Sequence, residues 1–349
     1  MKSLNNIKIG YWPCSYSVDR PDDRRRFYYF AKENQIKFEL FDSKSSYDIV
    51  VLTQNSDIGL LPSLKKKNTK VIYDCIDSYV ADELSFKGRL RGLAKFLNKD
   101  TKKLYWNYAR TLKRKLPEFD AIICASEEQR LKLLEYSNNV HAIPDMLNDG
   151  HIESKKIYDA SHKIKIVWEG LGTNAFHLRI LKSTLLSLSN KHNLELHLVT
   201  DPFYFKHMNR FSKRSTIDEV KDVCDKVFLH KWEKDTFSKK IIDCDLAIIP
   251  LNQGNALAYG KPENKLISLW KMGMPVVTAN TDSYKRVMKE AKIDLYCNDE
   301  NDWIKNINSL IESKDLRQEV AKKGLDFSQE NYSDEVVLKK WHLLFSSVI

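Results

Sequence analysis

The sequence predicts a two-domain α/β protein whose sheets are mostly parallel and doubly wound. Short apolar runs alternate with longer amphipathic stretches along almost all of the 349 residues, which is the pattern of strands joined by crossover helices. The length suits two domains of ordinary size. A polar stretch over residues 145–162 interrupts the alternation once. We interpret this stretch as the linker between the domains.

The first half is predicted to contain six strands and three helices. The strands are expected at Ile7–Tyr11, Phe38–Phe41, Ile49–Leu52, Lys70–Tyr73, Ala121–Ala125 and Val140–Ile143. Helical spacing of apolar residues places helices at Arg24–Asn34, Leu84–Leu116 and Glu127–Tyr136. The long second helix is expected to end before Pro117, because proline cannot continue a helix.

The second half repeats the alternation and ends in consecutive helices. Its strands are expected at Lys163–Trp168, Leu194–Thr200, Lys226–Trp232, Leu246–Leu251 and Pro275–Ala279. Its helices are expected at Phe176–Lys191, Pro262–Met272, Asp282–Ala291, Asn301–Ser313, Leu316–Gln329 and Asp334–Phe345. We therefore expect two Rossmann-like domains, residues 1–150 and 151–332, followed by a terminal helix within 333–349.

Composition narrows the classes of function. Lys and Arg number 57 and Asp and Glu 47, a net charge of +10 that favours an anionic partner. No apolar run is long enough for a transmembrane helix, and residues 1–10 lack the apolar run of a secretory signal. The six cysteines form no C-x-x-C pair, which favours reduced structural thiols and a cytoplasmic protein. No pattern typical of a metal site occurs, so no metal is expected.

The segment 243–279 carries the most chemical information. An apolar strand leads to a polar loop containing Gly254 and Gly260, and a helix begins at Lys261-Pro262. The first turn of a helix presents unpaired N–H groups and a positive dipole to an anion. Lys261 and Lys265 add two ammonium groups. Together these features predict a diphosphate-binding site.

The same segment resembles the donor-binding segment of glycosyltransferases with the GT-B fold, most closely family 4 (glycosyl transferases group 1). The similar residues are Lys261–Leu266 and the following Gly273-Met274-Pro275-Val276-Val277. Further segments resemble the family in the same order along the chain: Phe119–Glu128, Val140–Pro144, Trp168–Asn174 and Phe228–Trp232. The resemblance covers nearly the whole chain. It implies two Rossmann-like domains and a last helix that packs back on the N-terminal domain.

The resemblance implies transfer of a sugar from a nucleotide-sugar donor to a glycan or lipid-linked saccharide, in the synthesis of a surface polysaccharide. The nucleotide sugar is a co-substrate, and neither a cofactor nor nucleic acid is expected. Family 4 members carry two glutamates eight positions apart, but here Gly260 and Ser268 stand at those positions. The family's retaining outcome is therefore open for this chain. Three alternatives remain: an enzyme resembling nucleotide-sugar epimerases, a non-catalytic protein that binds nucleotide sugars or glycans, and a nucleic-acid-binding protein, which only the net charge suggests.

The chemistry of binding a diphosphate and sugar hydroxyls, together with the resemblance, indicates the residues of the donor site. The contacts expected for the diphosphate are Lys261, Lys265, Asn264, Gly172 and Thr173. Those expected for the sugar, ribose or base are Asn252, Gln253, Asn255, Ser268, His230 and Trp232. For the asparagines and the glutamine, a solvated loop side chain is the alternative interpretation.

The resemblance implies that the loop after the first strand faces the acceptor, and aromatic rings there can stack on sugars while polar groups bind hydroxyls. The alternative interpretation of this segment is a capped helix start with a solvated run of charges. The candidate acceptor residues are Tyr11, Trp12, Tyr16, Arg20 and Arg24. Asp74 and Asp77 follow another strand, and either could serve as general base; Glu263 is a third candidate catalytic residue. Capping of the next turn is the structural alternative for both aspartates.

The run 86–116 contains eleven Lys or Arg residues and a single acidic residue, Asp100. Its apolar residues recur at helical spacing, so a basic amphipathic helix is expected. Such a helix can lie on an anionic membrane surface. We therefore expect a cytoplasmic protein that is peripheral to the inner membrane face. The alternative is a helix packed on the core with a solvated basic face.

Overall fold

The computed structural model describes residues 4–76, 92–93, 95–97, 101–147, 153–207, 211–252 and 260–349. The chain forms two compact units. Unit 1 consists of Met1–Met146, Gly260–Pro262 and Ser333–Ile349, and unit 2 consists of Leu147–Tyr259 and Glu263–Tyr332. The chain therefore passes from one unit to the other several times, and the last helix belongs to unit 1.

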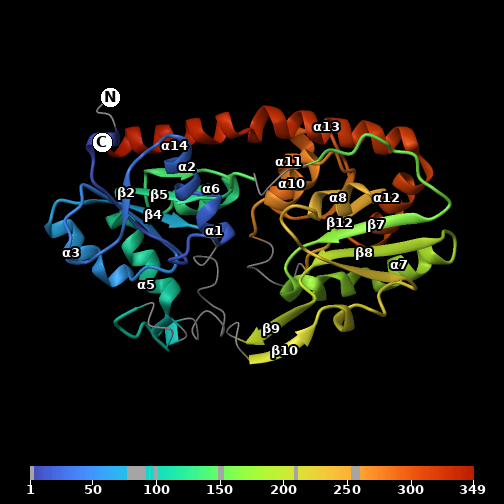
Figure 1. Ribbon diagram of the computed structural model, residues 1–349, viewed down its shortest axis with the longest axis horizontal. Helices are drawn as coiled ribbons and strands as arrows, with labels where there is room; N and C mark the ends of the chain where they lie inside the picture. The colour runs from blue at the N-terminus through green and yellow to red at the C-terminus, as the bar shows by residue number, and fades with distance from the viewer. Residues whose placement is uncertain are drawn as a thin grey trace. The chain divides into compact units, whose positions relative to one another are not determined.

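Unit 1 is built on a parallel sheet of six strands in the order β2-β1-β3-β4-β5-β6 (Figure 1). The strands are β1 (Ile9–Trp12), β2 (Phe38–Leu40), β3 (Ile49–Thr53), β4 (Lys70–Cys75), β5 (Ala121–Cys124) and β6 (Val140–Ala142). Every residue of the central strand β3 is buried. A strand covered on both faces needs a continuous apolar run, which explains why these strands were visible in the sequence.

The helices of unit 1 cover both faces of this sheet, as expected for a doubly wound fold. They are α1 (Pro21–Arg24), α2 (Phe27–Glu33), α3 (Leu61–Lys66), α5 (Tyr108–Lys115), α6 (Glu127–Leu133) and α14 (Asp334–Val348). Short 3₁₀ turns lie at Leu4–Asn6, Ile58–Leu60 and Leu116–Glu118. On α14, Trp341 and Phe345 stack on Phe30 with ring centroids 5.5 Å apart in both pairs. The expectation that the last helix packs back on the N-terminal domain is thus confirmed.

Two helices predicted in unit 1 are interrupted. The helix expected at Arg24–Asn34 is divided into α1 and α2, because the backbone at Arg26 leaves the helical region. The helix expected at Leu84–Leu116 is also wrong as a continuous element, since residues 101–107 are not helical. Asn107 begins α5 as an N-cap, its side chain accepting the N–H of Arg110 at 3.0 Å. Residues 84–91, 94 and 98–100 of that prediction lie outside the described ranges.

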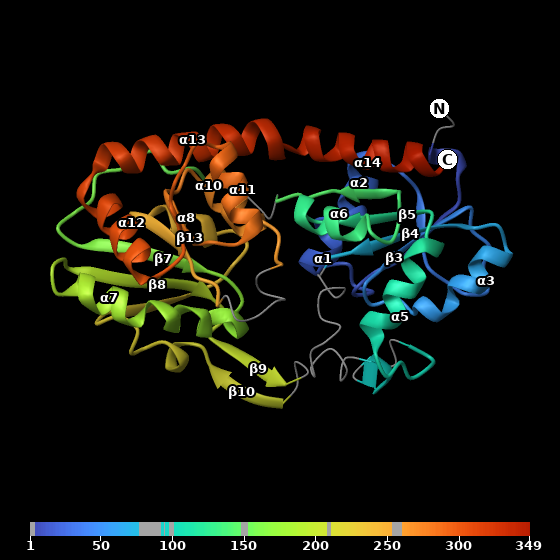
Figure 2. The ribbon, with the colours of Figure 1, turned by 180° about the vertical axis from the view of Figure 1, so that it is seen from behind.

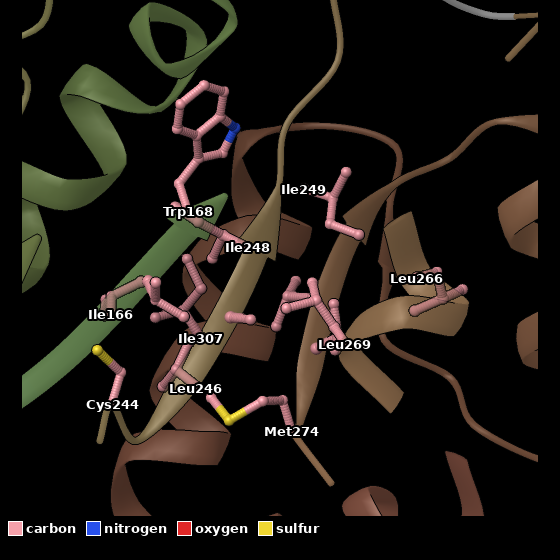
Figure 3. Close-up of a cluster of buried hydrophobic side chains, with 14 of the residues drawn as sticks. Ile166, Trp168, Cys244, Leu246, Ile248, Ile249, Leu266, Leu269, Met274 and Ile307 are labelled. Atoms are coloured by element: carbon pink, nitrogen blue, oxygen red, sulfur yellow. The ribbon is translucent and has the colours of Figure 1, made fainter. Parts of the chain in front are cut away.

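Unit 2 contains a second parallel sheet of six strands, in the order β11-β8-β7-β12-β13-β14. The strands are β7 (Ile164–Glu169), β8 (Leu194–Thr200), β11 (Val227–Lys231), β12 (Leu246–Ile249), β13 (Val276–Ala279) and the short β14 (Tyr296–Cys297). An antiparallel hairpin that the sequence did not predict, β9 (Phe203–His207) and β10 (Phe211–Ser215), follows β8. Figure 3 shows the apolar core between β12 and its neighbours, with Ile248, Leu246 and Met274 among the labelled side chains.

The helices of unit 2 complete a second doubly wound domain. They are α7 (Lys182–Ser189), α8 (Phe237–Ile242), α10 (Asn264–Lys271), α11 (Asp282–Glu290), α12 (Glu300–Glu312) and α13 (Lys314–Tyr332). Two 3₁₀ segments, η5 (Gly172–Leu181) and η6 (Ile217–Glu219), accompany them. The helix predicted at Phe176–Lys191 is therefore a 3₁₀ segment up to Leu181 and an α-helix only over Lys182–Ser189. Helix α13 packs against α10, which lies beneath it in Figure 2. Within the described residues, no helix has the length and apolarity needed to span a bilayer.

Candidate active site

The strongest candidate site in unit 2 is the place where the start of α10 meets the turn after β7. The Lys265 ammonium donates to the backbone carbonyl of Glu169 at 2.7 Å and lies 5.1 Å from the centroid of the Trp168 ring. A side chain at Gly170 would collide with the Lys265 ammonium. The absence of a side chain at Gly170 therefore leaves the space that the lysine occupies. This cation lies at the carboxyl edge of a parallel sheet, where α/β proteins bind ligands.

A second contact joins the loops that follow β7 and β12. The backbone N–H of Asn252 donates to Nδ1 of the buried His177 at 3.0 Å. Because Nδ1 accepts this bond, a neutral His177 carries its proton on Nε2. The contact fixes the start of the loop after β12. His177 could not be predicted as a site residue, since a single histidine in a 3₁₀ segment belongs to no motif. Gln253 and Asn255 were predicted in the same loop and lie outside the described residues.

The glycine turn predicted to face the diphosphate is packed against the base of the β9–β10 hairpin. A Cβ at Gly172 would lie 2.6 Å from Oγ1 of Thr216, and that hydroxyl donates to the Asp201 carbonyl at 2.6 Å. Gly172 is buried, whereas its neighbour Thr173 is exposed. Of this predicted pair, Thr173 is therefore the residue whose side chain a solvent-borne ligand could reach.

Glu263 lies at the start of α10 and is almost completely buried. Its Oε1 accepts the hydroxyl of Tyr332 at 2.6 Å and Nη2 of Arg286 at 2.9 Å. Burial, followed by the charge and hydrogen bond of Glu263, raises the pKa of Tyr332 well above its usual value. The carboxylate thus joins the start of α10 to α11 and to the end of α13. This geometry favours a positioning role for Glu263 over proton transfer.

The other predicted residues of the 260s segment are half-buried. Asn264 is the first residue of α10 and Ser268 lies one turn further along that helix. Lys261 belongs to the short segment Gly260–Pro262, which groups with unit 1. Lys265 is thus the lysine of the predicted pair that lies at the edge of the unit 2 sheet.

His230 and Trp232, the predicted base contacts, lie on and just after β11. Nε2 of His230 is 2.9 Å from Nδ1 of His197, and the two rings are parallel with centroids 5.2 Å apart. Nε2 of His197 lies 3.4 Å from a carboxylate oxygen of Glu195. Trp232 stacks on Phe237 with centroids 5.2 Å apart. These contacts give both predicted residues partners within unit 2.

In unit 1, Asp23 organises the loop after β1 and was missed as a site residue. Its carboxylate accepts the hydroxyl of Tyr11 at 2.6 Å and the backbone N–H groups of Cys14 and Ser15 at 2.7 and 2.8 Å. Burial raises the pKa of Asp23, and these hydrogen bonds counteract that rise. An acidic residue just inside a helix that begins with Pro21 was the available signal.

The predicted acceptor residues are divided between the interior and the surface of unit 1. Tyr11 is buried, and Trp12 stacks on Phe41 with centroids 5.0 Å apart. Tyr16 and Arg20 are exposed, and Arg24 donates to the carbonyl of Asp19 at 2.6 Å. Tyr11 and Trp12, which lie on β1, do not expose their rings fully, whereas the ring of Tyr16 is exposed.

Asp74, the last residue but one of β4, lies in a buried ion-pair network. Nε and Nη2 of Arg26 donate to its two carboxylate oxygens, both at 2.7 Å, and Nη1 donates to Asp145 at 2.8 Å. The side chains of Arg26 and Asp74 are each 1% exposed. A bidentate pair of this kind favours a structural role for Asp74. Asp77, the second candidate base, lies outside the described residues. The described part of the chain contains no group of His, Cys, Asp and Glu side chains able to hold a metal ion.

No protein-family model and no curated protein matches the chain by sequence. Among solved structures, HepE from Anabaena, in complex with UDP and glucose, is 12% identical with a TM-score of 0.63 over 98% of this chain and 100% of that one. A glycosyltransferase from Rickettsia africae is 12% identical with a TM-score of 0.62, covering 97% of both chains.

TarM is 16% identical with a TM-score of 0.60 over 85% of this chain, and this chain spans about half (54%) of the length of TarM. At these identities the likeness establishes the architecture. Two six-stranded parallel sheets, with a last helix returning to the first unit, agree with it. The chain therefore has the GT-B fold of these glycosyltransferases.

Proposed function

We propose that this protein transfers a sugar from a nucleotide-sugar donor to a glycan or lipid-linked saccharide. The observation that carries the proposal is the Lys265 ammonium at the start of α10, held by the Glu169 carbonyl and the Trp168 ring. Glycosyl transfer releases a nucleoside diphosphate, and stabilising its developing negative charge is the main task of the enzyme. A fixed cation beside a helix N-terminus can perform this task.

The identity of the first donor to test follows from the similar structures. HepE has been solved with UDP-glucose and with UDP and glucose, and TarM with UDP. We therefore take UDP as the first nucleotide for this chain. Lys265 would bind the diphosphate, with Thr173 and the N–H groups at the start of α10 nearby in the same unit.

For the acceptor we propose the surface of unit 1 beside the loop after β1. Tyr16 offers an exposed ring, and Arg20 an exposed cation. Asp23 fixes the loop through Tyr11 and two backbone N–H groups. This arrangement supports acceptor binding by a rigid loop. We place the reaction in the cytoplasm, as a step of surface-polysaccharide synthesis.

The test is calorimetric titration of the full chain with UDP, GDP, ADP, CDP and CMP. Replacing Lys265 by Ala removes a charge-assisted hydrogen bond, which is worth about 1.5–3 kcal/mol, so UDP affinity should fall roughly 10- to 100-fold. Lys289→Ala, at an exposed position of α11, is the matched control and should change the affinity less than twofold. Equal UDP binding by Lys265→Ala and the wild type, or no binding of any nucleotide, would exclude the proposed donor site.

A non-catalytic nucleotide-sugar-binding protein is the second candidate. It is favoured by one observation: the two positions that carry glutamates in family 4 members are Gly260 and Ser268 here. Release of UDP from UDP-sugars in the presence of an acceptor extract would exclude this candidate. Conversion of the donor sugar without any acceptor would instead indicate epimerase-like chemistry.

A further inference from the structure

Residues 92–93 and 95–97, which are helical and are called the turn below, are packed against the segment that precedes α5 in unit 1. Gly92 lies so close to the backbone carbonyl of Tyr105 that no side chain would fit there. Lys95, on the same turn, is only 6% exposed. Its ammonium donates to the Gln54 carbonyl at 2.7 Å and lies 4.8 Å from the centroid of the Tyr108 ring. The turn is thus attached to the rest of unit 1 through its lysine.

The apolar side chains of the turn face solvent instead. Leu97 is 62% exposed, and Leu93 and Phe96 are exposed as well. Trp106, which follows the residue packed on Gly92, is 79% exposed. This is the reverse of the usual arrangement, in which apolar residues turn inward and lysine outward. Several large apolar side chains exposed in one place are typical of a surface that is covered by a partner.

Exposed cations lie close in the chain to these apolar side chains. Exposed Lys102 and Lys103 lie between the turn and Trp106 in the chain, and exposed Arg110 and Arg114 lie one turn apart on α5. In Figure 1, residues 101–107, in teal, lead into the N-terminal end of α5; Arg110 lies near the start of that helix and Arg114 in its last turn. We name the apolar–basic surface after its members: Leu93, Phe96, Leu97, Lys102, Lys103, Trp106, Arg110 and Arg114.

Charge and apolarity together identify the partner. A second copy of this chain would bring the same cations face to face, which is unfavourable. A nucleic acid would pair with the cations but leave the leucines, Phe96 and Trp106 in water. An anionic bilayer satisfies both features, because its headgroups attract Lys and Arg while its acyl boundary accepts Leu, Phe and Trp.

We propose that the apolar–basic surface inserts into the interfacial region of an anionic membrane. Leu93, Phe96, Leu97 and Trp106 enter the boundary between headgroups and acyl chains, and the four cations contact the headgroups. Insertion of this kind needs no continuous amphipathic helix, so it is compatible with the interruption at 101–107. This inference rests on the proposed function, because membrane binding would bring the protein to a lipid-linked acceptor at the bilayer surface.

The test is sedimentation of the full chain with vesicles of phosphatidylcholine, or of phosphatidylcholine and phosphatidylglycerol at about 7:3. The wild type should bind the anionic vesicles and leave the neutral ones. Lys102→Glu with Lys103→Glu should weaken binding at least tenfold, because each cation near the surface contributes about 1 kcal/mol. Leu97→Ser with Trp106→Ser should weaken it by a similar factor. Leu131→Ser, at a residue 59% exposed on α6 of the same unit, is the matched control and should bind like the wild type.

Further measurements decide between the alternatives. Brominated lipids should quench part of the tryptophan fluorescence, and this part should be missing in Trp106→Phe. If the serine variant binds vesicles like the wild type, or if quenching is the same in Trp106→Phe, insertion is excluded. If the serine variant turns a dimer into a monomer in size-exclusion chromatography, a second copy is the partner and the proposal is wrong.

UDP titration of the same variants separates this inference from the proposed function. Unchanged UDP affinity in a variant that has lost vesicle binding would show that the two properties are independent. A wild type that binds anionic vesicles but not UDP would contradict the proposed donor site and leave the membrane-binding proposal standing.

Discussion

At the scale of single residues, glycines decide where a functional side chain can lie. Gly170 leaves space for the Lys265 ammonium beside the Glu169 carbonyl. In Gly170→Ala the new methyl group should displace the ammonium, which is the end of a flexible side chain. We therefore expect UDP affinity to fall about as far as in Lys265→Ala, with a loss of unfolding free energy below about 1 kcal/mol. Calorimetry and urea unfolding measure the two effects.

The double variant Gly170→Ala with Lys265→Ala tests whether Gly170 acts through the lysine. If it does, the second substitution adds little to the loss of UDP affinity caused by the first. Additive losses would mean that Gly170 affects the nucleotide by another route.

Tyr332 provides a second prediction at this scale. Its hydroxyl donates to Oε1 of Glu263 at 2.6 Å, and Glu263 is buried. Tyr332→Phe removes this donor from a buried carboxylate and should cost about 1–3 kcal/mol of unfolding free energy. Tyr16→Phe, at an exposed tyrosine, is the control and should have no measurable effect. Equal stabilities of the two variants in urea unfolding would contradict the role given to the Glu263 contact.

At the scale of elements, strands were easier to predict than breaks within helices. Buried strands such as β3 and β12 are continuous apolar runs, and a run of this kind can be recognised in a single sequence. The interruption before α5 depends on the cap at Asn107, and one asparagine in a basic stretch does not reveal a cap. The β9–β10 hairpin was missed because its strands carry Phe203 and Phe205 outward instead of into the core.

Helix α13 is packed closely enough on α10 to allow a prediction. A Cβ at Gly324 would lie 2.5 Å from two ring atoms of Trp270, which is itself buried. The Trp270 ring is rigid and has no free space in the core into which it could move. Gly324→Ala should therefore lower the unfolding free energy by about 1–3 kcal/mol. Gln318→Ala, on the exposed face of α13, should stay within about 0.5 kcal/mol of the wild type. An unchanged stability of Gly324→Ala would show that α13 can shift along α10.

His197 on β8 and His230 on β11, which contact each other, should make the unfolding free energy depend on pH. Burial lowers the pKa of His197 and of His230; the charges of Lys240 and Lys165 lower that of His230 further, while Glu195 counteracts the shift of His197. The unfolded chain, with ordinary histidines near 6.5, therefore binds more protons below that pH than the folded protein does. The unfolding free energy should fall as the pH is lowered from 7.5 to 5.5.

Replacing both histidines by glutamine should reduce that pH dependence. Urea unfolding of the wild type and of His197→Gln with His230→Gln at the two pH values measures the difference. His141→Gln in unit 1 is a useful comparison, because burial also lowers the pKa of His141 and it should account for part of the remaining slope. A steeper slope in the double variant would contradict the pKa directions on which the prediction rests.

At the scale of the whole molecule, the sequence order of the elements predicted the fold class, whereas the site depends on distant pairs. The Arg26–Asp74 pair joins residues 48 positions apart, and the Lys265–Glu169 contact joins residues 96 positions apart. Nothing in the local sequence near Asp74 shows that an arginine will occupy its carboxylate. The sequence pattern could place Lys265 in the first turn of a helix, but only the folded sheet shows that its ammonium binds the Glu169 carbonyl.

The chain order also makes unit 1 depend on its last seventeen residues, Ser333–Ile349. On α14, Val337, Trp341, Leu344, Phe345 and Val348 are buried against unit 1. Burying a large apolar side chain contributes about 1.5–3 kcal/mol, so five amount to roughly 10 kcal/mol, as much as a typical domain's net stability. A chain ending at Tyr332 should therefore lose the folded unit 1. Limited proteolysis should then cleave residues 1–146 rapidly while fragments of unit 2 persist.

Two point substitutions on α14 give the same argument a finer test. Trp341→Ala removes a fully buried indole that stacks on Phe30 and should cost about 3–5 kcal/mol. Leu343→Ala removes a side chain that is largely exposed two positions away and should cost less than about 0.5 kcal/mol. Hydrogen exchange should show the loss of protection in β1 and α2 for Trp341→Ala alone. If both variants are equally stable, α14 does not complete the core of unit 1, and a stable unit 1 without it becomes possible.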